Sequence, residues 1–471
     1  MFVGKLWRQY FEEKFEQTGK GKRPKTLPRN QLKVLLLDLY VGWKQDPTMV
    51  IGVGLATASY KADSRYNALH ISDIMPALAR HAHEVGLIDW HKGSESARRT
   101  TRVWPTELLL KEFRGARFGL LDVGRHEEQE LIVLSDAEFY EVDGKKKHRI
   151  ELEYEDTDYP PIREMRTNLK AYNELLGRTF VDIPTLDRPF IEQFVTEKNG
   201  QSTKRVQVGQ SNKLVRRIFY RGSWEFGGRL HGGWWQQVKS DWRKQIYIND
   251  EPTVEQDYSG MHVNLLYGLK GLPAVTDPYT VDQVLDMEPQ EQRKHIKSLV
   301  LTAINAKTEK TAFQAFRGEQ PKGAPAKSFK DVTLKTMLDA FKEKNAPIAE
   351  DLCTDRGVEL MAIDGRITAS IINGFTTKNI PILTIHDSYI TSYEHTGLLR
   401  TMMNEATYEE LGGLEINIDQ EGVGIDQYRA FSNMDRANDY SYMLKSINTA
   451  ERTQRYKHRL QQFEEYVKQK P

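Results

Sequence analysis

Two stretches in the first third of the chain have apolar residues at helical spacing. We expect helices over residues 30–43 and 72–84, and Gly86 ends the second one. Strand-like runs follow at 87–88 and 100–104, with a polar, basic tip between them. This part of the chain therefore predicts two helices followed by a β-hairpin.

The remaining two thirds mix helical and strand-like patterns. Apolar, β-prone runs lead to Asp257 and Asp387, and a helical pattern covers residues 291–306. Residues 307–328 are polar and rich in glycine and proline, so we expect a loop there. A charged segment with helical spacing ends the chain. Strands and helices in this order indicate an α+β fold.

The composition excludes several classes of protein. The chain has 471 residues, enough for two or three domains, and 39% of them are hydrophobic. Its single cysteine, Cys353, rules out a disulfide framework and fits a reducing cytoplasm. The charged N-terminus does not resemble a signal peptide, and no apolar run approaches the ~20 residues that cross a bilayer. We expect a cytoplasmic protein without a membrane partner, and its oligomeric state stays open.

Positive charge is concentrated in two segments, although the net charge is only +1. Residues 201–244 contain many lysines and arginines but only two acidic residues, Glu225 and Asp241. Residues 14–33 are also basic. Locally basic segments in a neutral chain indicate a surface that follows a phosphate backbone, and a merely solvated surface is the alternative.

The two aspartates at the strand ends are the first candidates for chemistry. Two strands that each present one carboxylate at a turn can hold two divalent cations between them. Such a pair activates an attacking oxygen and stabilises a leaving oxygen in phosphoryl transfer. Oxygen ligands of this kind suit Mg²⁺, with Mn²⁺ as the alternative ion. On their own, Asp257 and Asp387 would also fit turn or capping positions.

A cationic stripe lies between these two strands in the sequence. Its members are four residues apart and share one face of the expected helix: Arg293, Lys297, Leu301 and Asn305. Two positive charges at this spacing suit a triphosphate. A surface helix would explain the stripe equally well if it stood alone.

Four segments together resemble the motifs of single-subunit RNA polymerases of phages and mitochondria, and of family A DNA polymerases. DYSGMH from Asp257 resembles motif A, residues 293–302 resemble motif B, and HDS at 386–388 resembles motif C. Upstream, EFGGRL with Arg229 resembles the T/D-x-x-G-R motif. The order and spacing also fit, over about residues 224–391, roughly a third of the chain.

The resemblance implies a role for each matching residue. Asp257, Asp387 and the backbone carbonyl of Tyr258 would bind the two metal ions. Arg293 and Lys297 would neutralise the phosphates of a nucleoside triphosphate, and Lys297 would protonate the leaving pyrophosphate. Residues that would line the base and sugar are Leu301, Asn305 and His262. Residues that would contact template or primer DNA are Arg229, His231, Arg216 and Arg217.

Two departures from the family pattern leave the choice of sugar open. Asn305 stands where the family normally has a tyrosine, and His262 stands where the DNA polymerases have a glutamate that excludes a ribose. The serine after Asp387 resembles the RNA polymerases, whereas the tyrosine after Asp257 resembles the DNA polymerases. RNA synthesis, by a small transcriptase or primase, is favoured over DNA synthesis.

The local patterns and the resemblance together predict a division of the chain. The expected parts are a basic arm (1–29), a winged-helix-like DNA-binding domain (30–115), a connecting, thumb-like region (116–220), a right-hand polymerase palm with fingers (221–430) and a solvated C-terminal helix (431–471). Winged helices have two helices and a hairpin with a basic tip, and they bind DNA or proteins. Two other classes remain, a replication initiator with an inactive palm and a metal-dependent nuclease, although a nuclease gives no reason for the cationic stripe.

Overall fold

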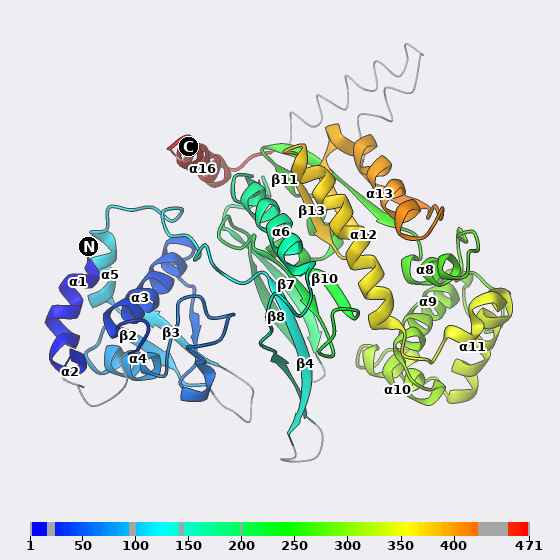
Figure 1. The fold of residues 1–471 in the computed structure, drawn as a ribbon, viewed down its shortest axis with the longest axis horizontal. Coiled ribbons are helices and arrows are strands. Elements are labelled where there is room, and N and C mark those ends of the chain that lie inside the picture. The colour runs from blue at the N-terminus through cyan, green and yellow to red at the C-terminus, as the bar shows by residue number, and fades with distance from the viewer. Residues whose placement is uncertain are drawn as a thin grey trace, which may run out of the picture. The chain divides into compact units, whose positions relative to one another are not determined.

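The computed structural model describes residues 2–16, 24–93, 100–140, 146–197, 200–422 and 451–469. The basic tip of the expected hairpin, at 94–99, and most of the segment before the last helix lie outside these ranges. The chain divides into two compact units, Met1–Glu130 and Leu131–Pro471, and its fold is a mixture of helices and strands (Figure 1).

The N-terminal unit contains a small sheet and several helices. Its strands are β1 (Ile51–Val53), β2 (Ile88–His91) and β3 (Thr101–Pro105), antiparallel in the order β1-β3-β2. Its α-helices are α1 (Phe2–Leu6), α2 (Glu12–Glu16), α3 (Pro28–Gln45), α4 (Ile74–Glu84) and α5 (Glu107–Arg114), with a π-helical segment at Trp7–Phe11 and a 3₁₀ turn at Thr57–Ser59. The expected helices and hairpin are therefore confirmed as α3, α4 and β2–β3.

The start of the chain differs from the expected arm. Phe2, Trp7 and Phe11 are buried in the core of the N-terminal unit, against the helices that follow. Phe2 makes an edge-on ring contact with Phe113, with 5.4 Å between ring centroids. These aromatic residues bury a large apolar area, and this burial makes residues 2–16 an integral part of the unit.

The C-terminal unit is built on two sheets and a separate hairpin. The first sheet has the order β10-β9-β4-β5 and the second β13-β14-β12-β11-β6, with β15 also paired to β12. All pairs are antiparallel except β4 with β9. The strands are β4 (Ile132–Tyr140), β5 (Lys146–Glu151), β6 (Val181–Asp182), β7 (Phe190–Glu197), β8 (Gly200–Gln207), β9 (Val215–Phe219), β10 (Gly227–Gly232), β11 (Tyr247–Ile248), β12 (Glu251–Tyr258), β13 (Ile382–Ile385), β14 (Ser388–Ser392) and β15 (Ile418–Glu421). β7 and β8 form the hairpin.

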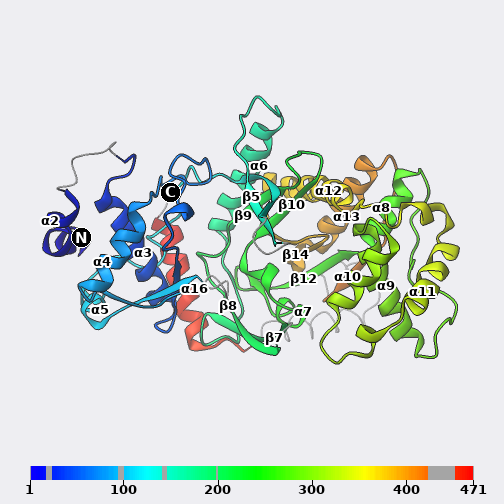
Figure 2. The same cartoon turned by 90° about the horizontal axis from the view of Figure 1, so that it is seen from below.

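Helices cover these strands on one face and extend beyond them as a helical lobe. The helices are α6 (Ile162–Gly177), α7 (Ser240–Arg243), α8 (Met261–Leu269), α9 (Pro289–Asn305), α10 (Glu309–Glu319), α11 (Asp331–Lys344), α12 (Gly357–Thr377), α13 (Thr396–Glu410) and α16 (Gln454–Gln469). Short 3₁₀ turns lie at Trp234–Gln237, Pro325–Ser328, Ala346–Asp351 and Tyr393–His395. α6 and α12 lie on the same face of the first sheet (Figures 1 and 2). α9, α10 and α11 pack together as the lobe.

The loop expected over 307–328 is wrong in its first half, because α10 begins at Glu309. The hydroxyl of Thr308 accepts a hydrogen bond from the backbone N–H of Thr311, and the hydroxyl of Thr311 accepts one from the backbone N–H of Thr308. This capping box satisfies backbone groups that would otherwise lack a partner at the helix start. Phe313 and Phe316 are buried on the inner face of the helix.

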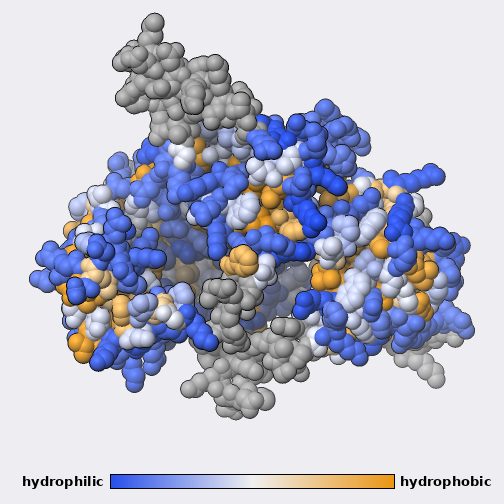
Figure 3. Space-filling view, turned by 180° about the vertical axis from the view of Figure 1, so that it is seen from behind, coloured by the Kyte–Doolittle hydropathy of each residue, from blue (hydrophilic) through white to orange (hydrophobic). Residues whose placement is uncertain are grey.

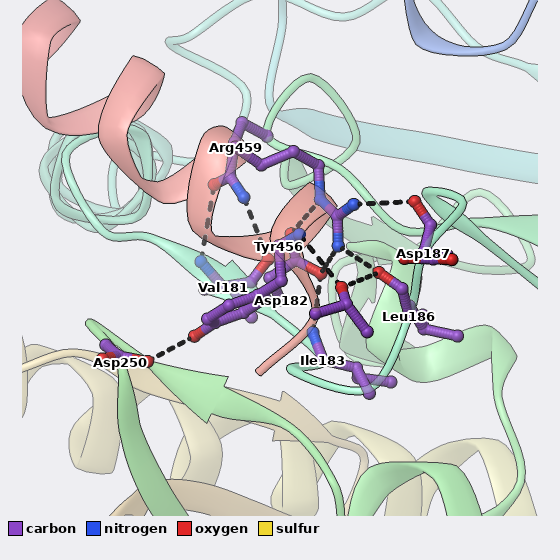
Figure 4. A network of polar contacts seen from close by, with 10 residues as sticks. Val181, Asp182, Ile183, Leu186, Asp187, Asp250, Tyr456 and Arg459 are labelled. Atoms are coloured by element: carbon purple, nitrogen blue, oxygen red, sulfur yellow. Dashed lines mark hydrogen bonds and ion pairs between the residues drawn. The ribbon is translucent and has the colours of Figure 1, made fainter. Parts of the chain in front are cut away.

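The last helix is anchored in the C-terminal unit, so the expectation of a solvated helix is wrong for α16. Arg459 makes two hydrogen bonds to the carboxylate of Asp182, of 2.8 and 3.1 Å, and Asp182 is buried (Figure 4). The hydroxyl of Tyr456 donates to Asp250 at 2.8 Å. Tyr456 and Phe463 are buried, and both contact the ring of Phe180.

One face of the molecule is mainly polar. Figure 3 shows hydrophilic residues over most of one face, interrupted by small groups of hydrophobic ones. Within the described ranges, none of the helices combines the length and the apolar character needed to span a membrane.

The ion pair between Arg459 and Asp182 generates a testable prediction. We expect Arg459→Ala to lower the free energy of unfolding by about 3–5 kcal/mol at pH 7.5, because it leaves a buried carboxylate unpaired. Burial raises the pKa of Asp182, and the hydrogen bonds and positive charge of Arg459 lower it in part. Without Arg459 the pKa of Asp182 in the folded state rises further. Protonation of Asp182 at lower pH then favours the folded form, so the loss of unfolding free energy in the variant becomes smaller toward pH 5.

Urea unfolding followed by tryptophan fluorescence at both pH values measures this loss. The matched control is Lys457→Ala on the exposed side of the same helix, which should change stability by no more than about 0.5 kcal/mol. A loss of stability that is equal at the two pH values would contradict the role given to the Arg459–Asp182 ion pair.

Candidate active site

The pairing of β12 with β14 brings the two predicted aspartates together. Asp257 lies opposite Ser388 in this antiparallel pair. Asp387 precedes Ser388 directly, in the two-residue turn that joins β13 to β14. The backbone N–H of Tyr258 donates to the backbone carbonyl of Asp387 at 3.3 Å. The two carboxylates are therefore neighbours at one end of the sheet, as the sequence predicted.

The turn that carries Asp387 has an unusual backbone. His386 has a φ of +57°, in the left-handed region that residues other than glycine seldom adopt. Such conformations are common at functional sites, where the surrounding structure holds them in place. The carbonyl of His386 accepts a hydrogen bond of 3.4 Å from the Thr368 hydroxyl, which helps to fix the turn.

A third aspartate lies beside the pair. β15 pairs with the other side of β12, and Asp419 lies opposite Asp257 in that register. The hydroxyl of Ser259 donates to the carboxylate of Asp419. The sequence did not single out Asp419, since only the pairing of two distant strands places it here.

The electrostatics of this group favour a bound cation. Burial and the nearby carboxylates of Asp387, Glu255 and Asp419 raise the pKa of Asp257 to about 7, and Lys297 acts in the opposite direction. Like charges at close range disfavour ionisation of both groups, and a divalent cation between them would remove this penalty.

The side chains available here suit Mg²⁺ better than a metal ion that takes all its ligands from the protein. Within the described ranges, no group of three or more His, Cys, Asp or Glu side chains is arranged to hold a metal ion. Mg²⁺ usually takes one or two carboxylates from the protein and keeps several waters or substrate oxygens. Asp257 and Asp387 match that pattern, and the carbonyl of Tyr258 stays a predicted additional ligand.

The cationic stripe is exposed along one face of α9. Arg293, Lys297, Leu301 and Asn305 all face solvent, and the opposite face is buried through residues that include Ile296, Leu299 and Val300. The spacing of four residues predicted this common face correctly. Asn305 donates to the backbone carbonyl of Leu301 at 2.8 Å, and its own carbonyl oxygen packs against Gly357, where a Cβ would clash.

The stripe lies close to the carboxylates. Lys297 Nζ and Arg293 Cζ lie 5.8 and 5.9 Å from the centre of the Tyr279 ring. Burial and then the charge of Asp387 raise the pKa of Tyr279, so this ring lies within electrostatic range of Asp387 as well as of the two cations. Arg293 also donates to Asp277 at 2.9 Å, and a triphosphate would have to share or replace that contact.

Arg229 belongs to a buried ionic cluster that the sequence did not predict. Its guanidinium pairs with the carboxylate of Asp364 on α12, a side chain with no exposed surface. It also donates to His262 Nε2 at 2.7 Å. Burial and the charge of Asp387 raise the pKa of Asp364 to about 6, whereas Arg229 lowers it. The cluster therefore couples the T/D-x-x-G-R segment to the motif C turn.

His262 is held as a neutral side chain by this cluster. Burial and the positive charge of Arg229 lower the pKa of His262 to about 3. Because a guanidinium only donates, His262 Nε2 must accept, so the proton is on Nδ1. That Nδ1 is buried and has no hydrogen-bond partner in the described part of the chain. A role in sugar recognition stays a prediction.

The predicted nucleic-acid contacts fall into two groups. Arg216 lies opposite His231 in the β9–β10 pair, so both side chains are on one face of the sheet. Burial, the charges of His386 and then those of Arg149, Arg229 and Arg216 lower the pKa of His231 to about 4. Arg149, on β5, thus adds to a basic face that the sequence only partly identified.

Arg217 departs from its predicted role. Successive residues of a strand point to opposite faces, so Arg216 and Arg217 cannot share a surface. The side chain of Arg217 is buried, and its Nε donates to the carbonyl of Gly228 at 2.8 Å. In this structure Arg217 is on the helix-covered face, away from the basic face with Arg216.

Comparisons with known proteins give little further information. Neither the protein-family models nor the curated proteins contain a match to this chain. Solved structures that match include the POL domain of Pol1 from M. smegmatis in complex with DNA primer-template and dNTP, with 12% sequence identity and a TM-score of 0.28. The match covers 56% of this chain and 53% of that one, so it spans about half of the solved chain. A TM-score this low carries no argument about function.

The Arg229–Asp364 pair generates a prediction about stability. We expect Arg229→Met and Asp364→Leu each to lower the free energy of unfolding by about 3–5 kcal/mol, since each leaves a buried charge without its partner. The double variant should cost much less than the sum, because it removes both charges together.

An exposed ion pair of the same unit provides the control. Arg205 and Glu192 are 2.8 Å apart on the β7–β8 hairpin, and both side chains are largely exposed. A double-mutant cycle to alanine should give a coupling below about 1 kcal/mol there. Urea unfolding measures both coupling energies. Equal values in the two cycles would contradict the claim that burial makes the Arg229–Asp364 pair couple more strongly than the exposed pair.

Proposed function

We propose that the C-terminal unit is a template-directed nucleotidyltransferase that makes RNA as a compact polymerase or primase. The observation that carries this proposal is the register of β12 and β14, which puts Asp257 and Asp387 side by side near the exposed cations of α9. In this proposal β12 to β15 form the palm, and α9 to α11 form the fingers. The four sequence motifs, in their order along the chain, support the same assignment.

Each proposed residue has a distinct task in the reaction. The 3′-oxygen of the growing strand forms a bond to the α-phosphorus, and the bond from that phosphorus to the pyrophosphate oxygen breaks. Asp257 and Asp387 would hold the divalent cations, and bound cations of this kind would supply activation of the attacking oxygen and stabilisation of the leaving one. Lys297 neutralises the triphosphate and gives a proton to the leaving pyrophosphate. Arg293 adds a second positive charge one helical turn away.

The neutral protonation state of His262 affects which sugar the site would accept. A neutral imidazole beside Arg229 places no negative charge near the expected position of the ribose, whereas a glutamate at this position excludes the 2′-hydroxyl in the DNA polymerases. A site that hydrogen-bonds the 2′-hydroxyl favours a ribose over a deoxyribose, which lacks that hydroxyl. These points support the use of ribonucleotides, and a small family A-like DNA polymerase is the alternative.

The central prediction concerns the two aspartates. Asp257→Ala and Asp387→Ala should each reduce nucleotide incorporation on a primed DNA template to below a few per cent of wild type, with little change in template affinity. The assay follows extension of a labelled primer with ATP and, in parallel, with dATP. We expect wild type to use ATP with a kcat/KM at least equal to that for dATP.

Asp241→Ala is the matched control, since this exposed aspartate lies on α7, outside the proposed site. It should retain full incorporation. Incorporation that persists in the Asp257 or Asp387 variant would refute the catalytic assignment. A strong preference of wild type for dATP would instead identify a DNA polymerase.

For the N-terminal unit we propose a winged-helix-like domain that contacts the phosphate backbone. The order of helices and strands, with β1-β3-β2 pairing and a β2–β3 hairpin, supports this layout. The exposed charged side chains at α4 include Asp73, directly before the helix, and Arg80 and Glu84 within it, so this helix has no strong positive charge. Lys92 and Arg102, both exposed on the hairpin, are better candidates for phosphate contacts.

A salt-dependence measurement tests the role of the hairpin. We expect the double variant Lys92→Gln, Arg102→Gln to reduce the slope of log K against log[salt] for duplex DNA by about 1.8, because two phosphate contacts are lost. Lys111→Gln, an exposed change on α5, is the control and should leave the slope unaltered. An unchanged slope in the hairpin variant would count against DNA binding by this unit.

A further inference from the structure

A small pocket lies on the helix-covered face of the first sheet of the C-terminal unit. It is open to solvent and is lined by residues of α6, α12 and the strands β9 and β10, and its volume is about 190 Å³. α6 and α12 lie side by side over this face in both ribbon views (Figures 1 and 2). Its lining is mainly apolar and includes Met165 and Ile372. The pocket is separate from the basic face that carries Arg216 and His231.

The Arg217 guanidinium faces this pocket without an anionic partner in direct contact. The Arg217 side chain is only 6% exposed, and its Nε donates to the carbonyl of Gly228. Its Cζ lies 5.3 Å from the centre of the Phe219 ring. Within the described part of the chain, its two terminal nitrogens have no hydrogen-bond partner, and no acidic side chain forms an ion pair with it. A guanidinium stays charged at neutral pH, so a buried charge is left without an anion.

The pKa of Arg217 supports the same conclusion. Burial and then the positive charge of Arg366 lower this pKa to about 10. A partner carboxylate would act in the opposite direction, and Glu410 and Tyr159 do so only as smaller influences. The local environment therefore disfavours the positive charge, and a bound anion would stabilise it.

Two side-chain amides complete the polar part of the pocket. Asn168 on α6 and Asn373 on α12 both line it, and both are half-buried. Each amide has two N–H donors, so together with Arg217 they offer several donors to one oxyanion. Glu164 also lines the pocket, but it is exposed, and solvent screens its repulsion of an anion.

We propose that this pocket binds a small carboxylate, with its oxygens on the Arg217 guanidinium and its short apolar chain against Met165 and Ile372. Planar carboxylates match the fork of a guanidinium. The pocket volume of about 190 Å³ is comparable to that of an apolar cavity of ~150 Å³ that binds benzene, a molecule of six non-hydrogen atoms. Butyrate has this size and chemistry, and the apolar lining favours it over phosphate.

Thermal unfolding of the full chain in sodium butyrate, sodium phosphate or sodium chloride at equal ionic strength tests the proposal. At ten times its Kd, butyrate should raise the Tm of wild type by about 2 °C relative to chloride. Arg217→Met should abolish this rise. Arg216→Met removes the same charge from the opposite face of the same strand, and it should leave the rise intact.

A second variant covers the case in which Arg217→Met does not fold. Asn373→Leu, at a half-buried position, should weaken butyrate binding at least fivefold by isothermal titration. An equal butyrate effect in wild type and in either pocket variant would overturn the proposal. A larger rise in phosphate than in butyrate would also overturn it, since the site would then not select a carboxylate.

Discussion

The antiparallel pairing of β12 is the constraint on which the proposed chemistry depends. β14 on one side and β15 on the other put Asp387 and Asp419 next to Asp257. Burial and then the charges of Asp387, Glu255 and Asp419 raise the pKa of Asp257, and the ladder of backbone hydrogen bonds prevents the strands from moving apart. A site with stored electrostatic repulsion of this kind is predisposed to bind a divalent cation.

The buried cluster around Arg229 extends this constraint into the helical layer. Asp364 neutralises Arg229 from α12, and Arg229 in turn fixes the protonation of His262 at the start of α8. A buried ion pair contributes little net stability, but it strongly penalises any arrangement that separates its partners. The cluster therefore specifies how three elements meet beside the two aspartates.

Local patterns in the sequence predicted local structure well. The four-residue spacing of Arg293 and Lys297 identified the exposed face of α9, and the apolar runs identified the strands that end near Asp257 and Asp387. Contacts between distant segments were not visible, which is why Asp419 and Asp364 were missed. The same holds for the anchoring of α16 by Arg459. Arg217 could have been placed correctly, because strand alternation already separates it from Arg216.

Metal-directed cleavage of the chain tests most directly whether Asp257 and Asp387 share one cation site. Fe²⁺ bound in place of Mg²⁺ generates hydroxyl radicals with ascorbate and oxygen, and these cut the backbone close to the metal. The account predicts cuts near both residue 257 and residue 387 in the same reaction, competed by Mg²⁺ and lost together in Asp257→Ala. Cuts at only one of these positions, or cuts that Mg²⁺ does not suppress, would contradict it.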